Sequence, residues 1–210
     1  MNYQWLSASG PYPIVEFHDV RVEKFRSDRY LALDAGLGGA DLGQFQAVGH
    51  PDRLIALRGF AGMESRRRAL TAAHASPAWA TQRRELADIT RSRDVILTRA
   101  ITPAEGTRPM RPGETYQALV SELRFPEQVG NYHLWLRLLL RKARLDPVAA
   151  FATLESANDV PAVPVTKNRT HHIALMRQGQ RPPELPHELR GMLRYAPEML
   201  VLEPAAVLVW

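Results

Sequence analysis

Residues able to do acid–base chemistry share one face of Pro13–Arg21, a segment with the composition of a β-strand. The strand period of two places Glu16 and His18 on the same side, about 7 Å apart, where a carboxylate could orient an imidazole as a general base. The alternative is a satisfied polar pair with a purely structural role. Because Val15 and Phe17 form the apolar opposite side, we expect that side to face helices and Glu16 and His18 to point away from them.

Four further residues are candidate contacts for a substrate. Arg58 ends a second strand-like segment, where it could anchor a carboxylate or cap the edge of a sheet. His74 and Trp79 lie near the junction of two expected helices, where the indole could be a platform for a ligand or part of the core. His172 shares a strand face with apolar residues and is either a binding residue or a half-buried core histidine.

The sequence lacks the patterns of several common catalytic sites. It has no cysteine and no His-x-x-x-His or His-Glu-x-x-His pair. His171 and His172 would face opposite sides of a strand, so we expect no metal site there. Glycine-rich phosphate-binding motifs and the Gly-x-Ser-x-Gly turn are also missing from the sequence. We therefore expect no metal and no cofactor.

Composition limits the class of protein further. The chain has 210 residues, 45% of them hydrophobic, which is enough for one large or two small cores. Its net charge is +5, but the basic residues lie at helical spacings beside acids or leucines, so we expect no binding to nucleic acid. Since no apolar run approaches the roughly 20 residues that span a bilayer, and residues 1–10 do not resemble a signal peptide, we expect no membrane association and a cytoplasmic location. The predominance of arginine over lysine suggests a bacterial source.

The chain divides near its middle. The segment Thr102–Gly113 contains three prolines and two glycines and has the composition of a linker. We therefore predict a first unit over residues 13–100, a linker over 101–115 and a second unit over 116–210.

The two halves show the same order of expected elements. In the first, the strands are Pro13–Arg21, Leu42–Val48, Arg53–Phe60 and Asp94–Ala100, and the helices are Ser27–Leu33, Gly62–Ser76 and Pro77–Thr90. In the second, the strands are Tyr116–Phe125, either Phe151–Leu154 or Ala162–Val165, then Thr170–Gln178 and Ala205–Trp210, and the helices are Glu127–Ala143 and Glu184–Tyr195. Each half thus reads βαββαβ.

Short paired segments support an internal repeat. Val15–His18 matches Ser121–Arg124, and Ile55–Arg58 matches Ile173–Met176, in the same element order. In the second half Glu122 and Arg124 would form a structural ion pair. A βαββαβ unit leaves one sheet face bare, and another copy is the obvious cover.

We therefore predict an α+β fold of two tandem ferredoxin-like units that form a dimeric-α/β-barrel-like pseudo-dimer within one chain. Alternatively, each half pairs with its twin in a homodimer. A pocket would lie between a sheet and its helices or inside the barrel.

Segment Pro51–Trp79 resembles the NIPSNAP family. In that family a strand ending in Arg-Gly-Phe is followed by a Met-Arg-Ala-Leu helix pattern and then by Pro-x-Trp, here Pro77-Ala78-Trp79. The family's first-strand pattern Val-Glu-Leu-Arg is similar to Val15–His18 and again to Ser121–Arg124. The resemblance covers residues 13–100, and residues 116–210 resemble a more distant tandem copy.

The resemblance implies the dimeric α+β barrel that small cofactor-free monooxygenases also have, and it implies little about activity. His18 stands where the family usually has arginine, and Ala73-His74 stands where it tends to have Phe-Tyr. The family's junction between Pro-x-Trp and the preceding helix lines a cleft, which would place His74 and Trp79 beside a ligand.

Three functions remain open. The first is the binding of a small apolar or aromatic molecule by a cofactor-independent monooxygenase-like enzyme with His18 as base and Glu16 as its orienting acid. The second is a non-catalytic ligand-binding or stress-associated module, and the third is a scaffold for assembly. If the protein is an enzyme, we expect the pocket in the first half, because the second half has Arg124 where the first has His18, and arginine stays charged.

Overall fold

The computed structural model describes residues 12–23, 38–101, 114–145, 147–156, 158–179 and 181–205. The first half contains β1 Ile14–Val22, β2 Ala40–Ala47, β3 Arg53–Phe60, α2 Met63–Ala75, α3 Pro77–Ile89 and β4 Thr90–Ile101. The second contains β5 Tyr116–Leu123, the 3₁₀ turn η1 Pro126–Gln128, α4 Val129–Lys142, β6 Ala149–Thr153, β7 Thr170–Arg177, α5 His187–Gly191 and β8 Glu198–Pro204.

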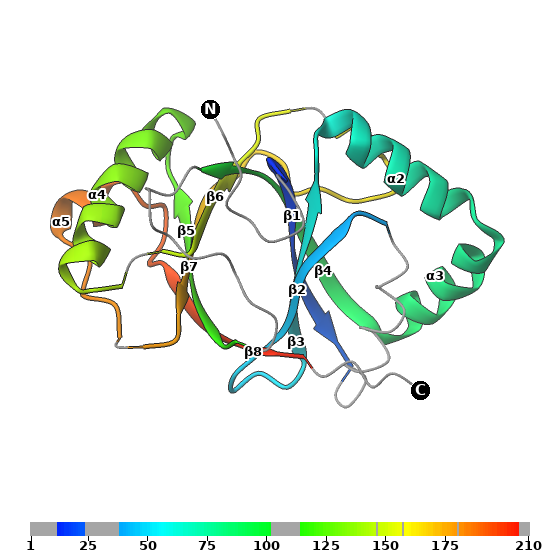
Figure 1. Ribbon diagram of the computed structural model, residues 1–210, viewed down its shortest axis with the longest axis horizontal. Helices are drawn as coiled ribbons and strands as arrows, with labels where there is room; N and C mark the ends of the chain where they lie inside the picture. The colour runs from blue at the N-terminus through cyan, green and yellow to red at the C-terminus, as the bar shows by residue number, and fades with distance from the viewer. Residues whose placement is uncertain are drawn as a thin grey trace.

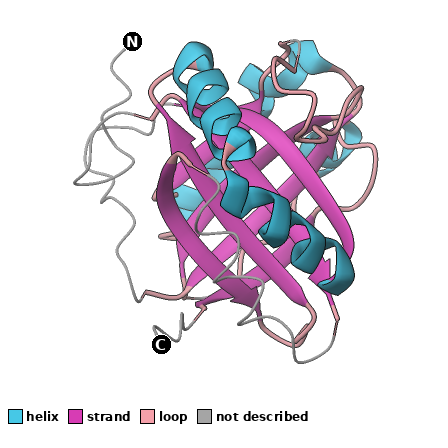
Figure 2. Ribbon diagram, turned by 90° about the vertical axis from the view of Figure 1, so that its right-hand side faces the viewer, coloured by secondary structure: helices cyan, strands magenta, loops and turns pink. Residues whose placement is uncertain are grey.

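The eight strands form one closed antiparallel barrel in the order β1-β3-β2-β8-β5-β7-β6-β4 (Figures 1 and 2). Each half contributes four adjacent strands, and within each half the first and third strands are central, with the fourth and second at the edges. The halves join at two seams, β2 with β8 and β4 with β6. Helices α2 and α3 lie outside the first half of the barrel, and α4 and α5 lie outside the second (Figure 1). The fold is therefore mixed α+β.

An apolar core fills the barrel. One buried hydrophobic cluster contains no helix residue and includes side chains from all eight strands. Val15 and Phe17 of β1 and Phe151 of β6 are among them. Val15 and Phe17 therefore point inward, and Glu16 and His18 point outward under the helices. The expectation that Glu16 and His18 face the interior is wrong, because a closed barrel excludes water from its inside whereas a helix packed outside can supply a charged partner.

Several element bounds differ from those expected. A strand runs over Glu198–Pro204, within the range where no strand was expected, and the expected strand Ala205–Trp210 lies outside the described residues except for Ala205. The last helix is limited to five residues by Pro186 before it and Gly191 at its end. The second strand of the second half is β6, Ala149–Thr153, which overlaps the expected Phe151–Leu154 and not the alternative Ala162–Val165. The expected helix Ser27–Leu33 and the linker Thr102–Gly113 lie outside the described residues.

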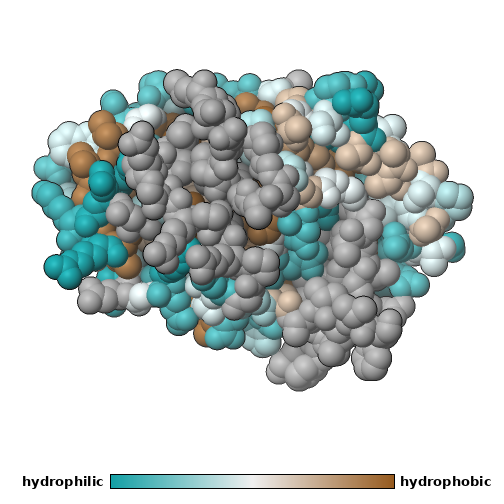
Figure 3. Space-filling view, viewed as in Figure 1, coloured by the Kyte–Doolittle hydropathy of each residue, from teal (hydrophilic) through white to brown (hydrophobic). Residues whose placement is uncertain are grey.

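Helix α4 shows an apolar surface toward solvent as well as toward the sheet. Its buried stripe includes Tyr132 and Leu136, whereas Leu134, Trp135 and Leu138 are exposed. Hydrophobic side chains interrupt the hydrophilic surface at this side of the molecule (Figure 3). No helix in the described ranges is long and apolar enough to cross a membrane.

Ser76 separates α2 from α3 and caps the second of them. Its hydroxyl donates to the Ala73 carbonyl and accepts from the Trp79 amide at 3.3 Å. Replacing Ser76 with alanine should lower the free energy of unfolding by about 1 kcal/mol, because the Trp79 amide loses its side-chain acceptor and keeps the Ser76 carbonyl as its acceptor. Urea denaturation measures this loss. The control Thr81→Ala, at an exposed position of α3, should cost nothing, and an equal effect of both changes would contradict the cap.

Candidate functional site

A buried ion cluster lies between β1 and α2. The Glu16 carboxylate accepts from Arg66 Nε at 2.8 Å through Oε1, and its Oε2 lies 2.9 Å from His18 Nε2. Glu16 and Arg66 are fully buried, and His18 is 1% exposed. Arg66 also contacts Asp159, which lies on the long connection from β6 to β7. The cluster therefore ties β1, α2 and that connection together.

The hydrogen bonds fix the protonation of His18. Arg93 Nη2 lies 2.8 Å from His18 Nδ1, and because a guanidinium can only donate, Nδ1 is the acceptor. The ring proton is then on Nε2, where it donates to Glu16. Burial and the charge of Arg93 lower the pKa of His18, against the opposing effect of the hydrogen bond to Glu16. His18 is therefore a neutral imidazole with both ring nitrogens engaged.

Glu16 is an ionised carboxylate despite its depth. Burial alone would raise its pKa, but the hydrogen bond with His18 and the charges of Arg66 and Arg58 prevail and lower the pKa to about 2. Arg58 stands directly opposite Glu16 in the pairing of β1 with β3. Arg58 thus belongs to the Glu16 cluster rather than to a site of its own.

A cavity of about 260 Å³ lies beside this cluster, between α3 and the connection from β6 to β7. Its walls include His74, Trp79, Arg83 and Arg93, together with smaller apolar residues. His18 does not line it, and reaches it only through Arg93. The cavity combines an aromatic surface, two guanidinium groups and one imidazole.

His74 is the imidazole that faces this cavity. Its ring stacks on the Trp79 indole with 4.9 Å between centroids and 13° between planes. Burial, followed by the charges of Arg93 and Arg83, lowers its pKa, so the ring is neutral at neutral pH. Its Nδ1 is buried and has no hydrogen-bond partner among the described residues. A neutral imidazole in the wall of a cavity can accept a proton from a bound molecule.

The structure separates His172 from the other predicted site residues. His172 lies under α4, on the other side of the barrel, with its Nε2 3.0 Å from His133 Nδ1 and its ring edge-on to Tyr132. The predicted ion pair of Glu122 with Arg124 is also absent from the described contacts. Glu122 accepts from Arg169, while Arg124 donates to the Leu193 carbonyl.

Sequence reasoning missed Arg66, Arg83 and Arg93. Arg93 carries a usable signal, because it shares a strand face with Val95 and Leu97 and is the charged member of an otherwise apolar row. Arg66 lies within three consecutive arginines, a pattern typical of a solvated helix face. In the described part of the chain, no group of three or more His, Cys, Asp or Glu residues could hold a metal ion.

The chain resembles solved structures of low sequence identity. A protein from Lactobacillus acidophilus, provisionally described as a monooxygenase, is 11% identical over 91% of this chain and 93% of its own, with a TM-score of 0.53. A Fusobacterium nucleatum protein with the same provisional description is 10% identical over 92% of each chain, with a TM-score of 0.51. A NIPSNAP-like domain protein from Burkholderia xenovorans is 18% identical over 47% of this chain and 91% of its own, with a TM-score of 0.38.

The likeness to the Lactobacillus acidophilus and Fusobacterium nucleatum proteins, over 91% and 92% of this chain, is one of fold. No protein-family model matches the chain, and a search of curated proteins finds no match either.

Proposed function

We propose that this chain binds a small aromatic acid in the cavity under α3 and removes a proton from it with His74, as a cofactor-independent, monooxygenase-like enzyme. The observation that carries the proposal is a neutral imidazole stacked on an indole beside two guanidinium groups. An aromatic ligand fits the Trp79 surface, and Arg83 and Arg93 complement its negative charge.

The same two arginines serve the proton transfer. Burial and, after it, the charges of Arg93 and Arg83 lower the pKa of His74, so the neutral ring can act as a base. When the ligand loses its proton, the new negative charge develops near fixed positive charges that are already in place. The carbanion formed in this way would add to molecular oxygen and take up a proton to give a hydroperoxide, and cleavage of its O–O bond with loss of water would leave a carbonyl group on the ligand. The provisional description of two structural neighbours as monooxygenases supports this step.

In this proposal Glu16 and His18 position Arg93 instead of touching the ligand. Glu16 holds the ring proton of His18 at Nε2, and this leaves Nδ1 as the acceptor for Arg93. The role first expected for His18 as the base thus passes to His74.

The proposal includes a division of the chain into two ferredoxin-like units, 13–100 and 116–210, joined by a linker over 101–115. The identical strand order in each half supports this division, and the single-chain barrel supports an internal pseudo-dimer. The functional cavity belongs to the first unit, since α3 and β4 supply its charged residues and Trp79.

Calorimetric titration with salicylate tests the binding step. We expect Arg83→Gln and Trp79→Ala to weaken salicylate binding about tenfold, the loss expected for one charge-assisted or aromatic contact. Arg84→Gln is the matched control, because Arg84 is exposed on the same helix and does not line the cavity. Benzyl alcohol, which lacks the charge, should bind more weakly than salicylate. Equal losses for Arg83→Gln and Arg84→Gln would contradict this site.

The catalytic step needs the natural ligand. Native mass spectrometry of protein purified from its own host would identify a co-purifying molecule, and NMR would follow the exchange of its acidic proton with solvent deuterium. His74→Gln should slow this exchange about 100-fold while the molecule stays bound. Unchanged exchange would favour the alternative, a non-catalytic ligand-binding module. The hydrogen bonds of both His18 ring nitrogens within the protein also support this alternative.

A further inference from the structure

A second cavity, of about 690 Å³, lies where the two halves meet. Leu97 of β4 belongs to the first half, and most of the other lining residues come from the ends of β5, β6 and β7 and from the connection between β6 and β7. It shares no lining residue with the cavity under α3. Any ligand of this second cavity is therefore independent of the function proposed above.

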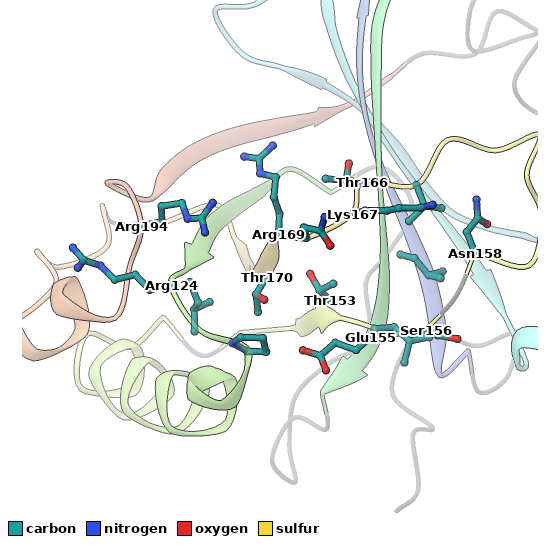
Figure 4. A pocket seen from close by; sticks show the side chains of 16 residues that line it. Arg124, Thr153, Glu155, Ser156, Asn158, Thr166, Lys167, Arg169, Thr170 and Arg194 are labelled. Carbon is teal, nitrogen blue, oxygen red and sulfur yellow. The ribbon is translucent and has the colours of Figure 1, made fainter.

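Positive charge dominates the lining. Four cationic side chains border the cavity: Arg124, Lys167, Arg169 and Arg194. Glu155 is the one carboxylate among its lining residues. Arg169 and Arg194 share the carboxylate of Glu122 just behind the lining. Arg169 and Arg194 stand on one side, and Thr153 and Glu155 stand on the other (Figure 4).

The internal contacts leave part of this charge unneutralised. Arg124 Nε donates at 2.8 Å to the Leu193 carbonyl, a neutral acceptor that leaves the guanidinium charge in place. Lys167 has no carboxylate partner in the described part of the chain. Asp94 of β4 acts on the charge of Arg169, and even with that carboxylate counted the cations outnumber the acids.

The connection that carries Lys167 and Arg169 is held in place. The Thr166 amide donates to the Val95 carbonyl at 2.8 Å, and the Asn158 side chain donates to the Val163 carbonyl at 2.7 Å. Asn168 adopts a φ of +58°, a conformation that asparagine tolerates better than most residues. The backbone that carries Lys167 and Arg169 is thus already ordered before a ligand binds, which lowers the entropic cost of binding.

We propose that this cavity binds a small organic oxyanion, with a phosphate or carboxylate head at the cationic side chains of its lining. The rest of such a molecule has apolar surface at Leu97 and Leu123 and hydroxyl partners at Thr153 and Thr170. Glu155 opposes an anion and therefore selects for molecules whose charge is confined to one end.

Titration calorimetry with glycerol 3-phosphate and with butyrate, a monocarboxylate, tests this site and shows which head group it takes. Lys167→Gln and Arg194→Gln should each weaken binding about fivefold, a moderate effect because both cations are partly solvated. Arg190→Gln, an exposed change one turn away on α5, should leave affinity unchanged. Equal losses with Arg190→Gln would show only general charge attraction and would overturn the site.

Glu155→Gln provides a test that misfolding cannot imitate. Removing the opposing carboxylate should tighten binding about threefold, whereas Glu188→Gln, an exposed change on α5, should not. No binding of either anion at millimolar concentration, or no gain from Glu155→Gln, would refute the proposal. Arg83→Gln should leave these affinities unchanged, so the two cavities can fail or succeed separately.

Discussion

Replacing Arg66 with methionine should lower the free energy of unfolding by about 3–5 kcal/mol. Arg66 is fully buried and donates to the equally buried carboxylate of Glu16 at 2.8 Å. Methionine fills much of the same space but leaves that carboxylate with His18 as its remaining close donor. Urea denaturation at pH 7 measures the loss as a shift of the midpoint.

Two variants separate the lost charge pair from general damage to α2. Arg67→Met removes an exposed arginine from the next position, whose ion pair with Glu64 is also exposed, and should cost less than 1 kcal/mol. The double change of Arg66 to methionine and Glu16 to glutamine should recover part of the stability, because the buried carboxylate that lost Arg66 is then replaced by a neutral amide. If Arg66→Met costs no more than Arg67→Met, the buried pair contributes nothing.

As the pH falls, this protein should begin to lose stability well above the pH range in which carboxylates titrate. Burial lowers the pKa of His171 to about 4 and that of His172 to about 3, from 6.5 in the unfolded chain. The fold thus disfavours their protonated forms, so their contribution is complete above pH 6.5 and declines as the pH falls. Between pH 6.5 and 4.5 the two together should remove about 4 kcal/mol of stability.

Urea denaturation at a series of pH values measures this slope. His172→Gln should reduce the loss over this range by about 2 kcal/mol, since glutamine binds no proton in either state. His187→Gln, at an exposed position, should leave the slope unchanged. Below pH 4.5 a further loss follows from Glu16, whose pKa of about 2 in the fold means that its carboxylate stabilises the protein above pH 4.5 and stops doing so as the pH falls toward 2. Stability that stays constant from pH 6.5 to 4.5 would contradict the burial of both histidines.

The sequence predicted the pairing of residues on β1 but not the side to which each pair points. Alternation places Glu16 with His18 and Val15 with Phe17, as the structure has them. Which pair faces inward depends on what covers each side. The covering residue, Arg66, lies 50 positions from Glu16 along the chain, and a strand pattern holds no information about it.

The sequence also did not indicate that Arg66 is buried. Arg66, Arg67 and Arg68 look alike in the sequence, yet their exposed side-chain fractions are 0%, 51% and 72%. Consecutive residues of an α-helix point in different directions around its axis, so the three arginines cannot all face the sheet. Helix α4 likewise buries Tyr132 and Leu136 and leaves Leu134 and Leu138 exposed.

Because one chain forms the whole barrel, the residues on its two outer faces can change independently. In a barrel built from two identical subunits, every substitution appears twice, so a charge useful on one face is imposed on the other. Here each substitution occurs once. Glu16 and its counterpart Glu122 illustrate the outcome, because the first is sealed beneath α2 by Arg66 and the second meets Arg169 near the surface. A chain of this design can refine a sheltered site on one flank and an open, charged one on the other without compromise between them.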